Sequence, residues 1–353
     1  MIYLDYQATT PLAPEALKAM LPWLEQGHAN PHSPHRAGRQ ARAAVEVARD
    51  QVAALLPSGG RVVFTSGATE ALNWAIKGAT GGITTTAIEH AAVLDSARAT
   101  GRPLTVLPVD REGVVAPQPV AAGTGLVAAM LVNNEVGTVQ PIAALADAAH
   151  RAGAWMLCDA VQGYGRIPLP DTIDLVAISA HKIYGPKGIG ALWIRDGITL
   201  PPLLHGGDQE GGRSGTLSPA LCAGFGAAAR LMASQADADA AHVERLWSRA
   251  IERLGPGWTL NGSAERRYRG NLNVRREGLD VARLMSDCRD IAFSAGSACA
   301  SGSGRPSHVL TALGLSDREA KSSIRIGFGR YTTEAELVEA IDRIDMAAKA
   351  QKP

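Results

Sequence analysis

The stretch that decides the fold is LVAISAHKIYGPKG, residues 175–188, in which a short apolar run leads into a turn-rich segment. Residues 175–178 have the uninterrupted apolar character of a strand buried on both faces, as in parallel sheets. Lys182 follows the carboxyl end of this strand, where open α/β sheets bind their ligands. A lysine desolvated there can lose its proton and form a Schiff base. An arbitrary lysine is far more often an exposed loop cation, so neighbouring motifs must decide between the two.

Outward from this segment, short apolar runs alternate with amphipathic stretches. The runs predict strands at residues 61–64, 83–86, 126–132, 155–158 and 191–194. The amphipathic stretches predict helices at residues 36–56, 68–77, 91–99 and 142–151. This alternation indicates an α/β fold whose mainly parallel sheet is covered by helices on both faces.

The texture changes after about Gly255. Candidate strands at residues 270–274, 291–293 and 324–327 interleave with helices at 281–287 and 334–349. This pattern predicts a second, smaller α/β domain, against which the first dozen residues are expected to pack. We therefore predict a large domain over residues 13–255 and a small domain formed by residues 1–12 with 256–353.

Composition excludes several classes of protein. The chain has 353 residues, 46% of them hydrophobic, and a net charge of +1, so it can bury a large core but has no electrostatic footprint for nucleic acid. The densest basic group, at Arg266, Arg267 and Arg269, is interpreted as a solvated turn. No apolar run is long enough to span a membrane, and the N-terminus lacks a signal-peptide pattern. These features predict a cytoplasmic protein.

Two further motifs follow predicted strands. Asp159 lies at the end of the predicted strand that contains Cys158. A carboxylate there could pair with the protonated pyridine nitrogen of an aldehyde cofactor, and Gln162 could reach the phenolic oxygen of the same ring. The turn TSGATE, residues 65–70, joins a strand to a helix, where free amides and the Thr69 hydroxyl favour an anion. Ordinary capping explains either motif equally well when it is taken alone.

The four cysteines, Cys158, Cys222, Cys288 and Cys299, are far apart and form no metal-binding pattern, which favours reduced thiols. Cys158 lies in an apolar strand and Cys222 in an alanine-rich helical pattern, so both are expected to be buried and inert. Cys299 lies instead in SAGSACASGSGRP, residues 294–306, which is small, polar and glycine-rich. Core packing does not explain a thiol in that setting.

The motifs occur in a single order: TSGATE, the Glu89-His90 pair, VNNEVG, DAVQ, SAHKIYGPKG, RSGT and AGSACASG. Together they resemble the cysteine desulfurases of the class V aminotransferase fold, from YLDYQATTP at residues 3–11 to SIRIG at 323–327. The resemblance implies the type I fold of pyridoxal-phosphate enzymes, with a seven-stranded sheet, and a homodimer.

The resemblance also implies a role for each matching residue. Lys182 would carry pyridoxal 5'-phosphate, Asp159 would pair with its pyridine nitrogen, and Gln162 would bond its phenolic oxygen. His90 would stack on the ring and assist proton transfer. Asn134 would contact both the cofactor and the substrate. The cofactor phosphate would be held by Ala68, Thr69, Ser179 and His181, and Thr216 would reach the phosphate bound in the other subunit. Arg325, helped by Asn30, would bind the substrate carboxylate.

In the implied reaction, Cys299 takes the sulfur of L-cysteine as a persulfide and L-alanine is released. The chain would bind no metal of its own, although Cys299 could transiently contact an iron–sulfur cluster on a partner. The expected partner is a sulfur acceptor, either an iron–sulfur scaffold or a sulfur carrier. A selenocysteine lyase or another class V aminotransferase-fold enzyme is the alternative. The segment 205–216 is one residue shorter than the family pattern, so contacts across the dimer are expected to differ.

Overall fold

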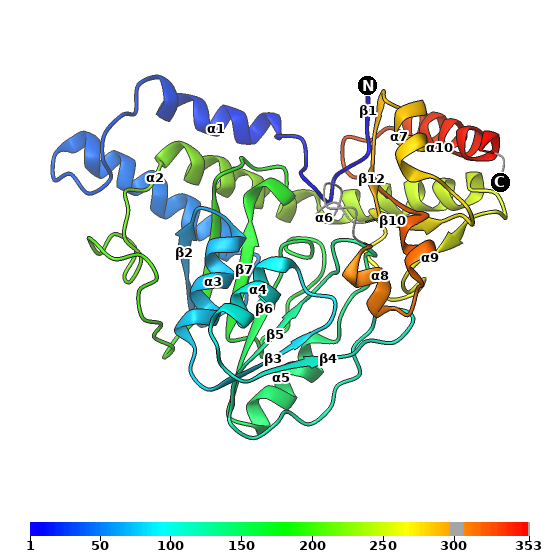
Figure 1. Ribbon diagram of the computed structural model, residues 1–353. Coiled ribbons are helices and arrows are strands. Elements are labelled where there is room, and N and C mark those ends of the chain that lie inside the picture. Colours follow the sequence, from blue (N-terminus) through cyan, green and yellow to red (C-terminus); the bar gives the residue numbers. More distant parts are fainter. Residues whose placement is uncertain (297–305, 352–353) are drawn as a thin grey trace.

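A seven-stranded sheet forms the centre of the larger part of the molecule (Figure 1). The computed structural model describes residues 1–296 and 306–351. The strands run in the order β2-β8-β7-β6-β5-β3-β4. They are β2 (Gly60–Thr65), β3 (Gly82–Thr86), β4 (Leu104–Leu107), β5 (Thr124–Met130), β6 (Trp155–Asp159), β7 (Leu175–Ser179) and β8 (Gly190–Arg195). Strand β8 runs opposite to the six other strands of this sheet, which share one direction, so the predicted mainly parallel α/β sheet is confirmed.

Helices cover both faces of this sheet because successive strand residues point to opposite sides. On β2, Val62 and Phe64 join one buried cluster and Val63 joins another. The first cluster includes side chains of α1 (Pro14–Glu25), α2 (Arg36–Ala53), α5 (Ile142–Arg151) and α6 (Pro219–Arg253). The second includes side chains of α3 (Ala68–Gly78) and α4 (Ala91–Ala99). Both faces are therefore buried.

A smaller antiparallel sheet lies beside the larger one, in the order β12-β13-β10-β9. Its strands are β9 (Thr259–Leu260), β10 (Asn271–Arg275), β12 (Ser294–Ala295) and β13 (Ser323–Gly327), accompanied by α7 (Val281–Asp287), α8 (His308–Ala312), α9 (Asp317–Lys321) and α10 (Glu334–Ala350). The N-terminal strand β1 (Ile2–Tyr3) pairs with β11 (Ile291–Ala292), and Leu4 is buried in the cluster of this smaller part. The first residues thus pack where the sequence predicts, while the domain boundaries stay a prediction.

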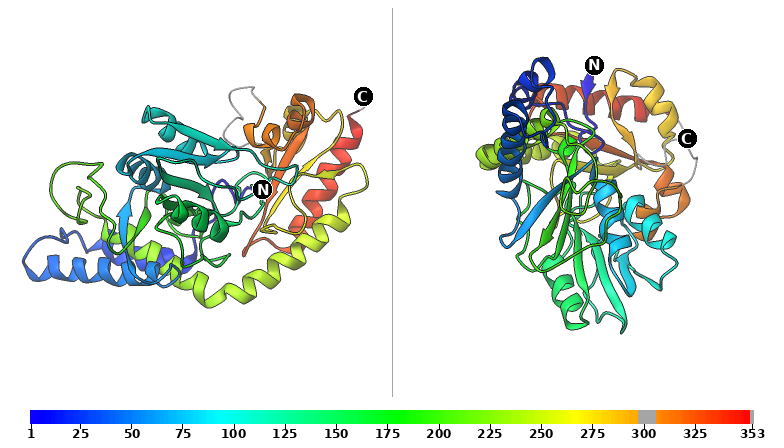
Figure 2. Two further views of the ribbon diagram at one scale, coloured as in Figure 1. Left: turned by 90° about the horizontal axis from the view of Figure 1, so that it is seen from below. Right: turned by 90° about the vertical axis from the view of Figure 1, so that its left-hand side faces the viewer.

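The long helix α6 connects the two parts (Figure 2). Phe225 near its start lies in the core of the large sheet, whereas Leu246 near its end lies in the core of the small sheet.

A buried arginine corrects one sequence-based expectation. Arg267 is only 7% exposed and donates to the carbonyls of Asn261, Ser263 and Asn271, so it is not part of a solvated turn. Burial lowers its pKa to about 9.

Candidate active site

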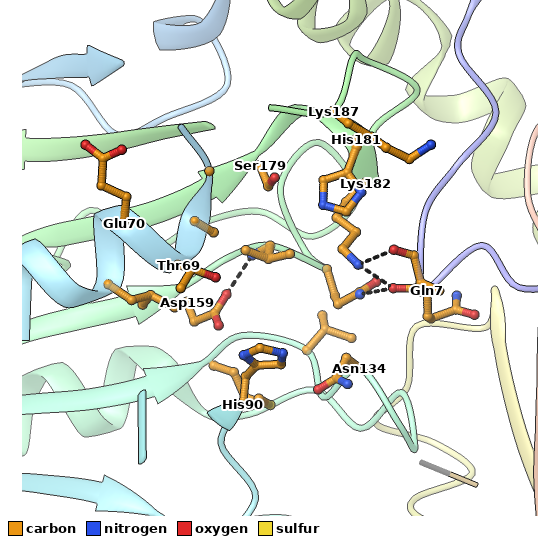
Figure 3. Close-up of a pocket in the computed structure, with 18 of the residues that line it drawn as sticks. Gln7, Thr69, Glu70, His90, Asn134, Asp159, Ser179, His181, Lys182 and Lys187 are labelled. Carbon is orange, nitrogen blue, oxygen red and sulfur yellow. Dashed lines mark hydrogen bonds between the residues drawn. The ribbon is translucent and has the colours of Figure 1, made fainter. Parts of the chain in front are cut away.

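A cavity of about 540 Å³ opens at the carboxyl ends of β5, β6 and β7 (Figure 3). Parallel strands bring their ends to one edge of the sheet, so residues distant in the chain meet there. Ten of the predicted site residues line this cavity: Ala68, Thr69, His90, Asn134, Asp159, Gln162, Ser179, His181, Lys182 and Arg325. The sequence motifs therefore converge in space.

Lys182 ends a short 3-10 helix, Ala180–Lys182, that follows β7. Its Nζ donates to the carbonyl oxygens of Gln7 and Ala8, each at 2.7 Å (Figure 3). The turn after it is held by Tyr184, whose φ of 68° is left-handed and whose N–H donates to Thr10 Oγ1 at 2.7 Å. The N-terminal segment thus holds both the amine of Lys182 and the left-handed turn that follows it.

Asp159 and His90 lie on the floor of the cavity. The Asp159 carboxylate accepts from the Val161 N–H at 3.0 Å, and burial raises its pKa although that bond, His90 and Lys182 act in the opposite direction. His90 caps α4, and its Nδ1 accepts from the Ala92 N–H at 3.1 Å, which fixes the plane of the ring. A carboxylate and an oriented imidazole therefore line the same cavity as the lysine (Figure 3).

The other end of the cavity is built to accept an anion. Helix α3 begins after Gly67 without a side-chain cap, so its first amides are open to a ligand. A Cβ on Gly190 would lie 2.7 Å from the Gly67 carbonyl carbon, so glycine at 190 lets β8 approach this turn closely. Burial and the nearby Lys182 and Lys187 lower the pKa of His181 to about 4, so its ring is neutral near pH 7.

Glu70 also lines the anion end and would repel an anion if its charge were left unpaired. Arg213 donates to both of its oxygens, at 2.8 and 3.2 Å, and the Ser66 N–H donates at 2.7 Å. Burial raises the pKa of Glu70, but the bonds from Arg213 and Ser66 outweigh this effect and lower it. The segment 205–216 thus contributes a neutralising arginine to this end of the cavity.

Arg325 lies in β13 and is 1% exposed. Its Nη1 donates to the Asn134 carbonyl at 3.0 Å, and its Nη2 donates to Asp5 at 2.7 Å and to Ser294 at 3.2 Å. The guanidinium lines the cavity, and its pairing with Asp5 was not predicted from the sequence. Asp5 and Gln7 lie in YLDYQATTP, residues 3–11, where the family resemblance begins. The residues that they contact are seen only in the folded chain.

Two predicted residues do not reach the cavity within one chain. Asn30 and Thr216 are both exposed, and neither lines the pocket. A role for Thr216 in the site of another subunit stays a prediction, as does a role for Asn30. Cys299 lies outside the described residues.

The class-V aminotransferase family model matches residues 2–340. The cysteine desulfurase IscS of Rickettsia akari is 42% identical, over 97% of this chain and 90% of that protein. The mitochondrial cysteine desulfurase of Eremothecium gossypii is 45% identical, over 97% of this chain and 75% of that protein. A solved NifS-like protein superposes with a TM-score of 0.90 at 33% identity, covering 98% of each chain.

The chain belongs to the cysteine desulfurases of the class-V aminotransferase family. In this desulfurase the buried thiols agree with the expectation that they are inert. Cys158 and Cys222 are fully buried, and burial raises the pKa of both, that of Cys222 to about 12. Cys288, which no motif supported, is buried as well.

The described part of the desulfurase offers no cluster of His, Cys, Asp and Glu side chains suited to a metal ion. Within the same residues, no helix combines the length and the apolar character that a membrane span requires.

Proposed function

We propose that this desulfurase uses pyridoxal 5'-phosphate to convert L-cysteine into L-alanine and transfers the sulfur to Cys299 as a persulfide. The observation that carries the proposal is the convergence of an amine, a buried carboxylate and an anion-binding turn on one cavity. The transfer balances without a further reactant. The Cβ–S bond of the substrate breaks, a sulfur–sulfur bond forms on Cys299, and the carbon that loses sulfur gains a proton.

The residues present fit the proposed cofactor. Its phosphate matches the uncapped start of α3, with Ala68, Thr69, Ser179 and His181 around it. Its pyridine nitrogen matches Asp159, whose carboxylate is buried and accepts a hydrogen bond from the Val161 N–H. Gln162, which donates to the Gln7 carbonyl at 2.9 Å, lies beside Lys182 in the same cavity, where the phenolic oxygen would lie. When bound, the cofactor supplies an electron sink for the carbon atoms of the substrate.

The side chains of this chain would then divide the work. Lys182 would hold the cofactor and, once its amine is free, would remove the proton from the substrate Cα. His90, whose ring is oriented by its hydrogen bond from the Ala92 N–H, would assist proton transfer beside the cofactor. Asn134 would contact the cofactor and the bound amino acid, and Arg325 would bind the substrate carboxylate. Cys299 attacks the substrate sulfur as a thiolate.

A homodimer is supported by an apolar stripe on α1. Leu17, Leu21 and Leu24 are 45%, 41% and 63% exposed, and their spacing places them on one face of the helix. We propose that a second copy of the chain covers this face, and that Thr216 of one subunit reaches the phosphate end of the other subunit's site. We further propose a cytoplasmic location and a protein partner that accepts sulfur, either an iron–sulfur scaffold or a sulfur carrier.

The test is an absorbance spectrum of the purified protein, followed by addition of L-cysteine with assays for alanine and sulfide. We expect a yellow protein that releases both products in the presence of a thiol reductant.

Cys299→Ser should keep the cofactor absorbance and lose sulfide release. A colourless protein that takes up no pyridoxal phosphate would end the proposal, whereas sulfide release by Cys299→Ser would remove only the role of that thiol.

A further inference from the structure

The guanidinium of Arg325 is already paired with a carboxylate, that of Asp5. Asp5 Oδ1 accepts from Nη2 at 2.7 Å and also accepts from the Ser294 hydroxyl at 2.8 Å, so the three side chains form a closed triangle. Ser294 lies opposite Arg325 in the pairing of β12 with β13. Asp5 is part of the N-terminal segment and makes an isolated bridge to Gly327. The pair therefore joins two segments that are 320 residues apart in sequence.

The covalent geometry of arginine limits what a second carboxylate can do. A guanidinium offers two forks for bidentate binding, one formed by Nε with Nη2 and one by Nη1 with Nη2. Both forks need a proton of Nη2. Because Asp5 and Ser294 both accept from Nη2, its two protons already have acceptors. The Nε–H is buried and has no acceptor among the described residues, so one fork is half filled.

We propose that Asp5 is a resident carboxylate on the Nη2 atom that both forks of Arg325 need, and that substrate must displace it to bind in bidentate fashion. This inference rests on the proposed function, in which Arg325 binds the substrate carboxylate. Asp5 acts through Arg325 and is therefore a positioning residue. The ligand that it excludes is any small amino acid with a free carboxylate.

The difference in exposure between the two side chains makes the exchange feasible. The Asp5 side chain is 21% exposed whereas that of Arg325 is 1% exposed, so the aspartate can return to water while the arginine stays buried. A buried guanidinium without any counter-ion is unfavourable, so an empty site gains from the resident carboxylate. An incoming carboxylate restores the same neutral pair and makes use of the unsatisfied Nε–H.

Asp5→Asn tests the proposal because it removes the charge and preserves the shape. The measurement is the dissociation constant of L-alanine for the cofactor-loaded protein, from the absorbance change on titration, with ethylamine as the ligand that lacks only the carboxylate. We expect the dissociation constant of L-alanine to fall about tenfold and that of ethylamine to stay within about twofold. An unchanged or weaker affinity for L-alanine would overturn the proposal.

Ser294→Ala gives a second reading if Asp5→Asn fails to fold. It frees one Nη2 proton without changing any charge, so L-alanine should bind a fewfold more tightly, again with no change for ethylamine. Arg325→Gln separates this inference from the proposed function. If Arg325→Gln does not remove the preference for L-alanine over ethylamine, the substrate role of Arg325 is wrong. If it does, and neither Asp5→Asn nor Ser294→Ala tightens binding, only the resident carboxylate is wrong.

Discussion

Replacing Glu89 with glutamine should change how the stability of this desulfurase depends on pH. Glu89 precedes the cavity residue His90 and is fully buried. Its Oε1 accepts from the Thr86 hydroxyl at 2.6 Å and from the Met130 N–H at 3.0 Å, while its buried Oε2 has no partner within residues 1–296 and 306–351. Burial raises its pKa from an ordinary 4.5 to about 8, with a further contribution from Asp159 that the two hydrogen bonds oppose. Glu89 is therefore protonated near pH 7.

The sign of the effect follows from proton binding. Between pH 4.5 and about 8 the folded chain keeps a proton on Glu89 that the unfolded chain has lost. Stability contributed by this group is therefore fully present at low pH and declines as the pH rises through this interval. A tenfold change in proton affinity corresponds to about 1.4 kcal/mol, so the whole interval is worth roughly 5 kcal/mol and the part from pH 6 to 8 roughly 2 to 3 kcal/mol.

The assay is urea unfolding of cofactor-free protein at pH 6, 7 and 8. Glu89→Gln carries no titrating group, so its free energy of unfolding should rise relative to the unsubstituted protein by about 2 to 3 kcal/mol between pH 6 and 8. Glu112→Gln, at an exposed glutamate, is the matched control and should keep the original pH dependence. If Glu89→Gln and the unsubstituted protein lose stability in parallel, Glu89 is ionised in the folded state and the reasoning fails.

Three further substitutions have distinct expected results. Arg49→Ala leaves Glu210, whose side chain is 3% exposed, without its two 2.7 Å bonds to the guanidinium, and should cost about 3 to 5 kcal/mol in urea unfolding. Lys182→Ala should leave a protein whose cofactor is lost on dialysis and that forms no alanine, whereas retained turnover would exclude the lysine from the chemistry. Leu21→Glu should shift the elution volume toward a monomer in size-exclusion chromatography, and an unchanged volume would show that α1 is not in the interface.

Much of the fold could be predicted because burial on both faces leaves a clear trace in sequence. The helices α4, α5 and α7 begin and end as their amphipathic patterns predict. The predicted strand at residues 126–132 is displaced to Thr124–Met130, since an apolar run marks a strand better than it marks its ends. The edge strand β4 was missed because Thr105 and Val106 are exposed and show no buried run.

Side-chain contacts between residues far apart in the chain leave no comparable pattern in the sequence. Arg267 reads as one of several surface arginines, yet its partners are backbone carbonyls, which every residue has and which no sequence pattern marks. Arg49 and Glu210 are 161 residues apart and belong to unrelated local patterns. Local periodicity reports which face of an element is buried, but the partner of a buried charge is decided by tertiary structure.

The N-terminal segment shows why this matters for the chemistry. The carbonyls of Gln7 and Ala8 accept hydrogen bonds from Lys182, and two residues earlier Asp5 holds Arg325. The proposed reaction uses both side chains, Lys182 at the cofactor and the substrate Cα, and Arg325 at the substrate carboxylate. A single short segment therefore contacts the groups that would act on both ends of the substrate. Displacement of Asp5 by a substrate carboxylate would occur next to the carbonyls that hold Lys182. Binding of the substrate carboxylate at Arg325 and the position of the Lys182 amine therefore depend on the same short stretch of backbone.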